Sequence, residues 1–215
     1  MENSVKFYLL RHGQTGMNLE KVFRGRLDPP LNTTGHEEAR CAAAFLKPVP
    51  MSFVLSSPLL RAVQTAEPVA KLQDLNLTIL RELIDVDFGK WQGMNEKQVG
   101  RRYGRLSTQW RKEPHRVTFP GGESLESVRE RLEEFLAFLR KTCAGRTGAV
   151  ISHRVPCKVL VCMLAEIPLK NFWNIKLDTG GISLFEVTED RAIIHFLNET
   201  QHLAGLGKQR VTHDF

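Results

Sequence analysis

The chain has 215 residues, of which 42% are hydrophobic and 25% are charged. This composition excludes disordered, collagen-like and membrane-spanning proteins, and it fits one large domain that can bury its own core. The 30 lysines and arginines against 24 aspartates and glutamates give a net charge of +6, which favours an anionic ligand without choosing among phosphate, nucleic acid and membrane.

Short apolar runs predict six strands, in chain order Val5–Leu10, Ser52–Leu55, Leu77–Leu80, Ala149–Ile151, Ile182–Val187 and Ala192–Leu197. Helical patterns lie between them. Thr34-Gly-His-Glu37 fits a capping box, which predicts a helix that starts there and runs to Leu46. Apolar residues recur with a period of about 3.6 from Leu125 to Leu139 and predict a long amphipathic helix.

Strands that alternate with helices indicate an α/β fold of three layers, in which helices flank a mainly parallel central sheet. The last two predicted strands are joined by Thr188–Arg191 alone, which predicts an antiparallel hairpin at one edge. The segment from Gly89 to Gly122 has no strand signal, and we expect it to form a small, lid-like helical lobe over the C-terminal edge of the sheet. Because no repeat or low-complexity linker interrupts the sequence, we expect residues 1–215 to form a single domain.

The four cysteines include no C-x-x-C pair and are typical of reduced packing residues. Only a short apolar run precedes Arg11, so we predict no signal peptide. The most apolar later stretch, Val155 to Leu169, contains two charged residues and is too short for a membrane span. These features predict a cytoplasmic protein that does not associate with membranes.

Polar residues follow four of the predicted strands, at the point where each apolar run ends. They are Arg11-His12-Gly13, then Ser56-Ser57-Pro58 with Arg61, then an acidic stretch from Glu82 to Asp87, and finally Ser152-His153-Arg154. In an open α/β sheet the ligand crevice lies beyond the carboxyl ends of the strands. We therefore expect two arginines, two histidines and a carboxylate to meet in one place.

This set of side chains suits phosphoryl transfer without a metal. Arg11 and Arg61 carry planar guanidinium groups that can hold phosphate oxygens in pairs. A neutral histidine can attack phosphorus, while a carboxylate can protonate the departing alcohol and later activate water. The residues alone thus predict a site that works through a covalent histidine intermediate.

Several segments, taken together, resemble one known family. LRHGQTGMN, residues 10–18, resembles the R-H-G-x-T-x-x-N signature of the histidine phosphatase superfamily in its phosphoglycerate mutase-like branch. Similar segments follow in order at 23–35, 56–66, 87–93, 120–132, 150–155 and 198–203. The resemblance implies a phosphomonoesterase that uses no metal or cofactor and acts on a small phosphorylated metabolite through a phosphohistidine.

The resemblance also implies roles for single residues. His12 would be the nucleophile, and Arg11, Arg61 and His153 would hold the phosphoryl oxygens, with help from Asn18. Gly13, which follows the nucleophile, fits a tight turn where the backbone approaches the ligand.

Three further positions are less regular. The general acid of the family is commonly a glutamate three residues before the Phe of an F-G-x-W-E-G-like motif, and the matching residue here is Asp85, with Glu82 and Asp87 as rivals. Arg24 stands where relatives place a residue that lines the pocket. Arg154 stands where many relatives have glycine, and it either adds positive charge at the pocket or points away from it.

Other functions stay open at this point. A phosphoglycerate-type mutase would use the same histidine but return the phosphoryl group to the substrate, although the chain is shorter than typical cofactor-dependent mutases. A non-catalytic phosphate-binding relative is the second alternative. We expect no nucleic-acid partner and no metal site, and the sequence leaves the oligomeric state open, a dimer included. An arginine-rich cluster in the predicted lobe is interpreted first as a solvated helix face and second as a positive rim for phosphorylated substrates: Arg101, Arg102, Arg105, Arg111, Lys112 and Arg116.

Overall fold

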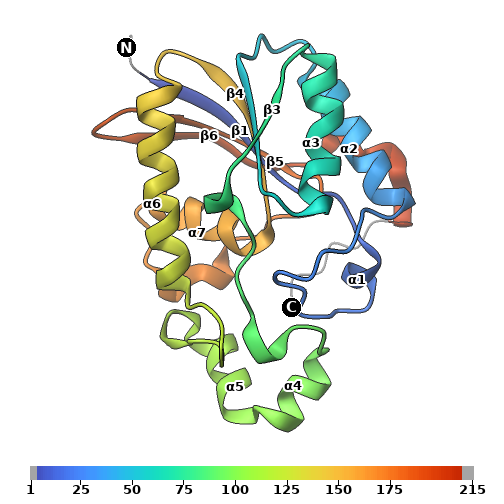
Figure 1. The fold of residues 1–215 in the computed structure, drawn as a ribbon, viewed down its shortest axis with the longest axis vertical. Helices are drawn as coiled ribbons and strands as arrows, with labels where there is room; N and C mark the ends of the chain where they lie inside the picture. Colours follow the sequence, from blue (N-terminus) through green and yellow to red (C-terminus); the bar gives the residue numbers. More distant parts are fainter. Residues whose placement is uncertain (1–3, 210–215) are drawn as a thin grey trace.

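The computed structural model describes residues 4–209, so both ends of the predicted domain, 1–3 and 210–215, lie outside the described residues. Within that range a six-stranded sheet lies between two groups of helices (Figure 1). The strands are β1 (Val5–Arg11), β2 (Phe53–Ser56), β3 (Leu77–Ile79), β4 (Thr147–Ser152), β5 (Ile182–Val187) and β6 (Ala192–Glu199). The helices are α1 (Gly16–Leu19), α2 (Thr33–Leu46), α3 (Leu60–Leu72), α4 (Glu96–Arg102), α5 (Gly104–Lys112), α6 (Leu125–Thr142) and α7 (Arg154–Leu164).

The order of the strands across the sheet is β3-β2-β4-β1-β5-β6. The first four pair in parallel, whereas β5 runs antiparallel to both β1 and β6. This arrangement confirms the mainly parallel sheet and the antiparallel hairpin at one edge. It also brings the carboxyl ends of β1, β2 and β4 side by side, which places the residues that follow them in one region.

Both faces of the central strands are buried, and successive residues serve opposite layers because strand side chains alternate. Leu10, Val54 and Ile151 pack in an apolar cluster with α2 and α3. Phe7 and Val150 pack on the other face with α6 and α7. Figure 1 shows these two pairs of helices on opposite sides of the sheet, so the three-layer α/β fold is confirmed.

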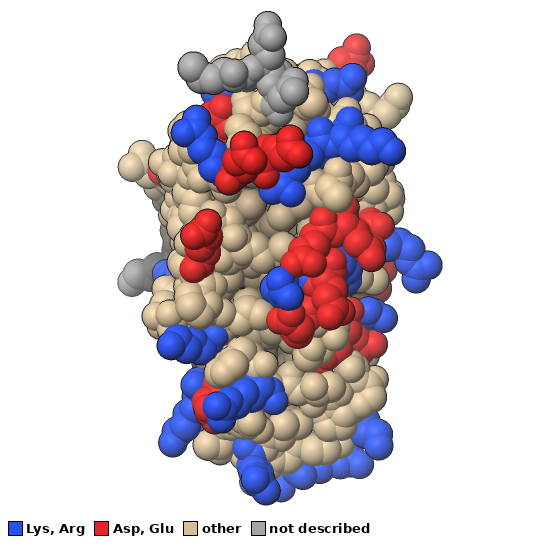
Figure 2. All heavy atoms as spheres, turned by 90° about the vertical axis from the view of Figure 1, so that its left-hand side faces the viewer, with Lys and Arg blue, Asp and Glu red and all other residues tan. Residues whose placement is uncertain are grey.

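The predicted amphipathic helix is α6. Its buried residues are the six that recur in the sequence: Leu125, Val128, Leu132, Phe135, Leu136 and Leu139. On its outer side, Arg129 forms ion pairs with Glu126 and Glu133, one turn away in each direction. The acidic patch near the middle of Figure 2 gathers on this side of the molecule.

The start of α2 differs from the prediction. The capping residue is Asn32 rather than Thr34, and the helix begins at Thr33. The Asn32 side chain accepts a hydrogen bond from the Gly35 amide at 2.8 Å and so satisfies one of the free amides of the first turn. Asparagine and threonine are both favoured at such positions, and the predicted cap at Thr34 is two residues later in the chain than the observed one.

Four strands, β1, β2, β4 and β6, extend beyond the ends of their apolar runs. β1 includes Arg11 and β4 includes Ser152, and these two residues pair with each other in the register of the sheet. Ladder hydrogen bonds join backbone groups, so a polar side chain does not end a strand that is paired on both sides. As a result, the backbone of Arg11 belongs to the rigid sheet.

The predicted lobe, residues 89–122, lies between β3 and α6 and is helical. It contains α4, α5 and the short 3-10 helices η2 (Gly89–Trp91) and η3 (Pro114–Arg116), and Figure 1 shows it at one end of the molecule. Its interior is aromatic, with Trp91 and Trp110 in edge-to-face contact with Phe119 at 5.1 and 5.0 Å between ring centroids. Trp173, in the 3-10 helix η4 (Leu169–Asn174), donates a hydrogen bond to the Trp110 carbonyl at 2.8 Å. No helix among residues 4–209 has both the length and the apolar character needed to cross a bilayer.

Candidate active site

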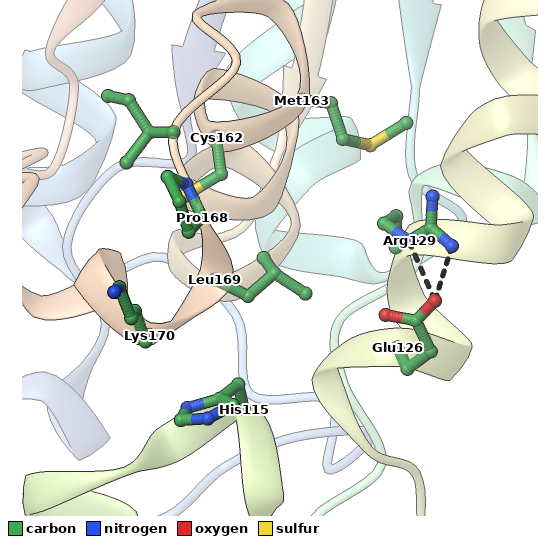
Figure 3. Close-up of a pocket in the computed structure, with 9 residues that line it drawn as sticks. His115, Glu126, Arg129, Cys162, Met163, Pro168, Leu169 and Lys170 are labelled. Atoms are coloured by element: carbon green, nitrogen blue, oxygen red, sulfur yellow. Dashed lines mark hydrogen bonds and ion pairs between the residues drawn. The ribbon is translucent and has the colours of Figure 1, made fainter.

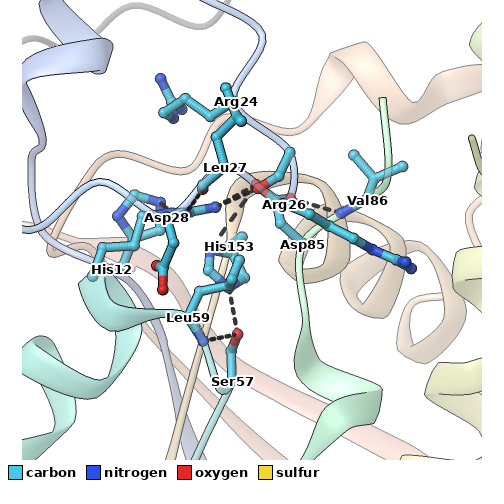
Figure 4. Close-up of polar contacts among 12 residues, drawn as sticks. His12, Arg24, Arg26, Leu27, Asp28, Ser57, Leu59, Asp85, Val86 and His153 are labelled. Carbon is cyan, nitrogen blue, oxygen red and sulfur yellow. Dashed lines mark hydrogen bonds and ion pairs between the residues drawn. The ribbon is translucent and has the colours of Figure 1, made fainter. Parts of the chain in front are cut away.

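Four of the predicted site residues meet where the sheet ends. His12 follows β1, Arg61 lies in the first turn of α3, Asp85 follows the 3-10 helix η1 (Arg81–Leu83), and His153 caps α7 after β4. Figure 4 shows His12, Asp85 and His153 converging from these separate elements. At least 95% of each of the four residues is buried, with exposures of 0%, 0%, 5% and 0%.

His12 is held from two sides. Its Nδ1 lies 2.7 Å from the Gly13 carbonyl oxygen, and Arg61 Nε donates to its Nε2 at 3.3 Å. A carbonyl can only accept, so the histidine hydrogen is on Nδ1, and Nε2 carries the lone pair that accepts from Arg61. Burial, and then the positive charges of Arg61 and Arg11, hold the pKa of His12 well below 6.5. The ring is therefore neutral near pH 7, as a nucleophile must be.

Arg61 links the histidine to a carboxylate. Its Nη2 donates to Asp85 Oδ2 at 3.0 Å and to the Gly25 carbonyl at 2.8 Å, while its Nη1 donates to the Leu27 carbonyl at 2.8 Å. The other oxygen of Asp85 accepts from the Val86 amide at 2.9 Å. Both side chains are thereby fixed, which is the preorganisation that phosphoryl transfer requires.

His153 completes the group. Its Nε2 lies 2.6 Å from Ser57 Oγ, its Nδ1 lies 4.0 Å from Asp85 Oδ2, and its ring centroid is 5.1 Å from that of His12 (Figure 4). A hydroxyl hydrogen given to Nε2 leaves the histidine hydrogen on Nδ1, where the carboxylate favours it. Burial and nearby Arg61 lower the pKa of His153 well below 6.5. The sequence pointed to Ser57 as the end of a strand but gave it no part in orienting this ring.

Two more arginines lie near this group. Arg11 Nη1 donates to the Leu177 carbonyl at 2.5 Å. Arg24 is 6% exposed; its Nη1 donates to the Met17 carbonyl at 3.3 Å, and its Nε has no partner among the described residues. Burial, then Arg11 and Arg154, lower the pKa of Arg24. An anion would stabilise a buried guanidinium group that lies beside other positive charges.

Asn18 and Arg154 are also buried. Asn18 Oδ1 accepts hydrogen bonds from the Thr15 amide and hydroxyl at 2.9 and 2.8 Å, so its amide hydrogens are the part able to donate to a ligand. The Arg154 guanidinium lies 5.8 Å from the centre of the Trp173 ring, a cation–π distance. It is close enough to Arg24 to lower the pKa of that side chain.

The two rival acids lie in other surroundings. Asp87 pairs with Arg26 at 3.4 Å and accepts from the Gly89 amide at 2.7 Å. Glu82 is half-buried, and its backbone carbonyl accepts from Arg131. Of these three carboxylates, Asp85 is the one that the described contacts join to Arg61 and His153.

The structure shows a packing constraint on Gly13. Its backbone does not have a positive φ, and a Cβ built on it would lie 2.5 Å from the Gly35 carbonyl oxygen. Glycine is therefore required here by the first turn of α2, which packs directly against this loop. Gly35 is constrained by the same packing, since a Cβ on it would lie 2.0 Å from the Gln14 carbonyl oxygen.

A hollow of about 420 Å³ lies elsewhere, between η3, α6 and the end of α7 (Figure 3). His115, Arg129, Met163 and Leu169 are among its lining residues. Its lining shares no residue with the group around His12, and it has no part in the chemistry described below.

The lowered pKa values of the two buried histidines predict a loss of stability in acid. Unfolded His12 and His153 would take up protons near pH 6.5, whereas both resist protonation in the folded protein. The unfolded chain then binds more protons, so the free energy of unfolding should fall as the pH drops from about 7 to about 5. Urea unfolding across this range measures the slope. The His12→Gln variant should show a shallower slope, and an equal one would contradict the assignment.

Comparison with known proteins shows similarity over nearly the whole chain. Residues 7–200 match the family model described as histidine phosphatase superfamily (branch 1). Phosphoserine phosphatase 1 of Hydrogenobacter thermophilus is 36% identical over 199 residues, which cover 93% of this chain and 94% of that protein. A 2,3-bisphosphoglycerate-dependent phosphoglycerate mutase of Cytophaga hutchinsonii is 30% identical over 186 residues, covering 83% and 85%. The crystal structure of the alpha-ribazole phosphatase from Shigella flexneri superposes with a TM-score of 0.82 at 26% identity, covering 90% of this chain and 96% of that one.

Proposed function

The chain belongs to the histidine phosphatase superfamily (branch 1), and we propose that it is a phosphomonoesterase that works through a phosphohistidine at residue 12. The observation that carries this proposal is the buried, neutral His12. Its Nδ1 hydrogen is given to Gly13, so its Nε2 is unprotonated and carries a lone pair, which accepts a hydrogen bond from Arg61.

The reaction would proceed in two displacements. His12 Nε2 attacks phosphorus, an N–P bond forms, and the bond from phosphorus to the ester oxygen breaks as Asp85, in its protonated form, gives that oxygen its proton. Asp85 then takes a proton from water, whose oxygen attacks phosphorus and releases His12. Both steps are helped because the acid, the nucleophile and Arg61 are already held in place.

The phosphoryl oxygens would be bound by the groups around His12. Arg11 and Arg61 supply guanidinium hydrogens, His153 supplies Nδ1–H, and Asn18 supplies its amide hydrogens. Arg24, whose buried Nε has no partner among the described residues, would be satisfied by the same group or by the rest of the substrate.

The substrate would be a small phosphate monoester, as the names of the relatives suggest for those proteins. Residues 1–215 would form one domain, with the lobe at 89–122 acting as a lid. The cluster from Arg101 to Arg116 is exposed on that lobe, which supports the interpretation as a positive rim or a solvated face. Four free cysteines support a cytoplasmic location.

The test is turnover of an aryl phosphate in the presence of EDTA, followed by intact-protein mass spectrometry after rapid acid-free quenching. We expect phosphate release and a transient adduct of one phosphoryl group. A stable adduct with little phosphate release, and transfer to an added phosphoglycerate, would identify a mutase instead, the activity named for one of the relatives. If neither turnover nor an adduct is detected, the protein would be a non-catalytic phosphate-binding relative.

A further inference from the structure

One peptide group behind the nucleophile has hydrogen bonds at both ends. The carbonyl oxygen of Gly13 accepts the His12 Nδ1 hydrogen at 2.7 Å, and the amide of Gln14, in the same peptide unit, donates to Glu38 Oε2 at 2.7 Å. The C=O and N–H of a trans peptide point in opposite directions. This flat group therefore connects the His12 imidazole to a carboxylate on its far side.

Glu38 reaches this peptide from the first turns of α2. It is fully buried, and it lies on the same side of the helix start as Asn32 and Gly35, at successive spacings of three residues. The Asn32 side-chain amide donates to Gln14 Oε1 at 2.9 Å, and the Asn32 backbone amide donates to the Gln14 backbone carbonyl at 3.0 Å. Gly35 packs against the same loop. The start of α2 thus forms a rigid support for the loop that carries His12.

The second oxygen of Glu38 holds another loop. Glu38 Oε1 accepts from the Thr179 hydroxyl at 2.9 Å. The next two residues bracket Arg11, since the Gly180 amide donates to the Arg11 carbonyl at 3.1 Å and the Arg11 amide donates to the Gly181 carbonyl at 3.3 Å. One carboxylate is therefore bonded to both segments that flank the Arg11-His12 pair.

We propose that Glu38 is a positioning residue for the reaction: through the Gly13–Gln14 peptide it fixes His12 in the tautomer that carries hydrogen on Nδ1 and leaves Nε2 free to attack phosphorus. This inference rests on the function proposed above. A hydrogen bond accepted by the carboxylate polarises the peptide and strengthens its carbonyl as an acceptor, and the effect is larger in a buried site than in water. The hydrogen bond to the Gly13 carbonyl raises the pKa of His12, whereas the positive charges of the nearby arginines lower it.

The test compares three variants in the full chain. Glu38→Leu removes both acceptors at similar size. Glu38→Gln keeps one oxygen for the Gln14 amide and presents an NH2 group to the Thr179 hydroxyl, which can accept. Glu37→Gln is the matched control, because Glu37 lies outward on the same helix and pairs with Arg40 at 3.6 Å. Each variant is assayed for kcat and KM with an aryl phosphate, for thermal unfolding, and for the His12 tautomer by ¹⁵N NMR.

We expect Glu38→Leu to lose about 10–100-fold in kcat with KM within about threefold, and to show mixed tautomers at His12. Glu38→Gln should recover kcat to within about fivefold and keep the Nδ1-protonated form, and Glu37→Gln should match wild type. A folded Glu38→Leu variant with wild-type kcat and tautomer would overturn the inference. If that variant does not fold, a folded Glu38→Gln variant with mixed tautomers would overturn it equally.

A failure of the role of Glu38 can be distinguished from a failure of the proposed function. Failure of the proposed function would appear in the wild type, which would then turn over no phosphate ester. Failure of the role of Glu38 would appear as an active wild type whose activity and His12 tautomer do not depend on this side chain.

Discussion

The His12→Ala variant should be inactive, with kcat lower by about 10⁴-fold or more, because it lacks the nucleophile of the first displacement and forms no phosphohistidine for water to attack in the second. The variant should still fold, since the buried ring is replaced by a smaller side chain in a site rich in other contacts. Phosphate release from an aryl ester measures the effect. Intact-protein mass spectrometry should show the phosphoryl adduct in wild type and none in the variant.

A matched control separates this effect from a general one. His36 is an exposed histidine of α2, and His36→Ala should keep wild-type turnover. Retention of more than a few per cent of activity by His12→Ala would rule out the phosphohistidine mechanism.

The second large effect is expected at Asp85. Asp85→Asn keeps one acceptor oxygen, which can serve Arg61 or Val86 but not both, and it removes the proton donor, which lowers kcat by about 10²–10⁴-fold. The loss should be greatest for alkyl phosphates, because an alkoxide is a poor leaving group without a proton, and smallest for nitrophenyl phosphate. Rates for a series of esters with different leaving groups measure this dependence.

Glu82→Gln is the control for the choice of acid, since Glu82 is one of the two rival acids in the sequence. It should leave the leaving-group dependence unchanged. If Glu82→Gln had the larger effect, the general acid would be Glu82 and the role of Asp85 would be limited to orienting Arg61.

Local patterns were sufficient for most of the fold. The β5–β6 hairpin and the buried face of α6 follow directly from sequence spacing, because each depends on neighbouring residues. The predicted cap of α2 was wrong by two residues, since Asn32 and Thr34 have similar capping propensities and only the hydrogen bond to Gly35 distinguishes them.

The site was predictable only in part, for a physical reason. His12 and His153 stand directly after strands, so the strand-end rule brings them together without any knowledge of packing. Glu38 carries no such signal. It follows Glu37 in a helix, where a pair of acids is typical of a solvated face, and its partners Gln14 and Thr179 are distant in sequence. Buried networks of this kind depend on long-range packing and cannot be read from spacing.

The tryptophans described in the fold have a practical consequence. The chain has three, and Trp91, Trp110 and Trp173 all lie in the lobe or bonded to it. Intrinsic fluorescence therefore reports this end of the molecule, whereas far-ultraviolet circular dichroism is dominated by the helices and sheet of the body. An unfolding curve followed by both signals would compare the cooperativity of the two regions without any label. Coincident curves would mean that the lobe and the body unfold as one unit, and a fluorescence change at lower denaturant would mean that the lobe unfolds first.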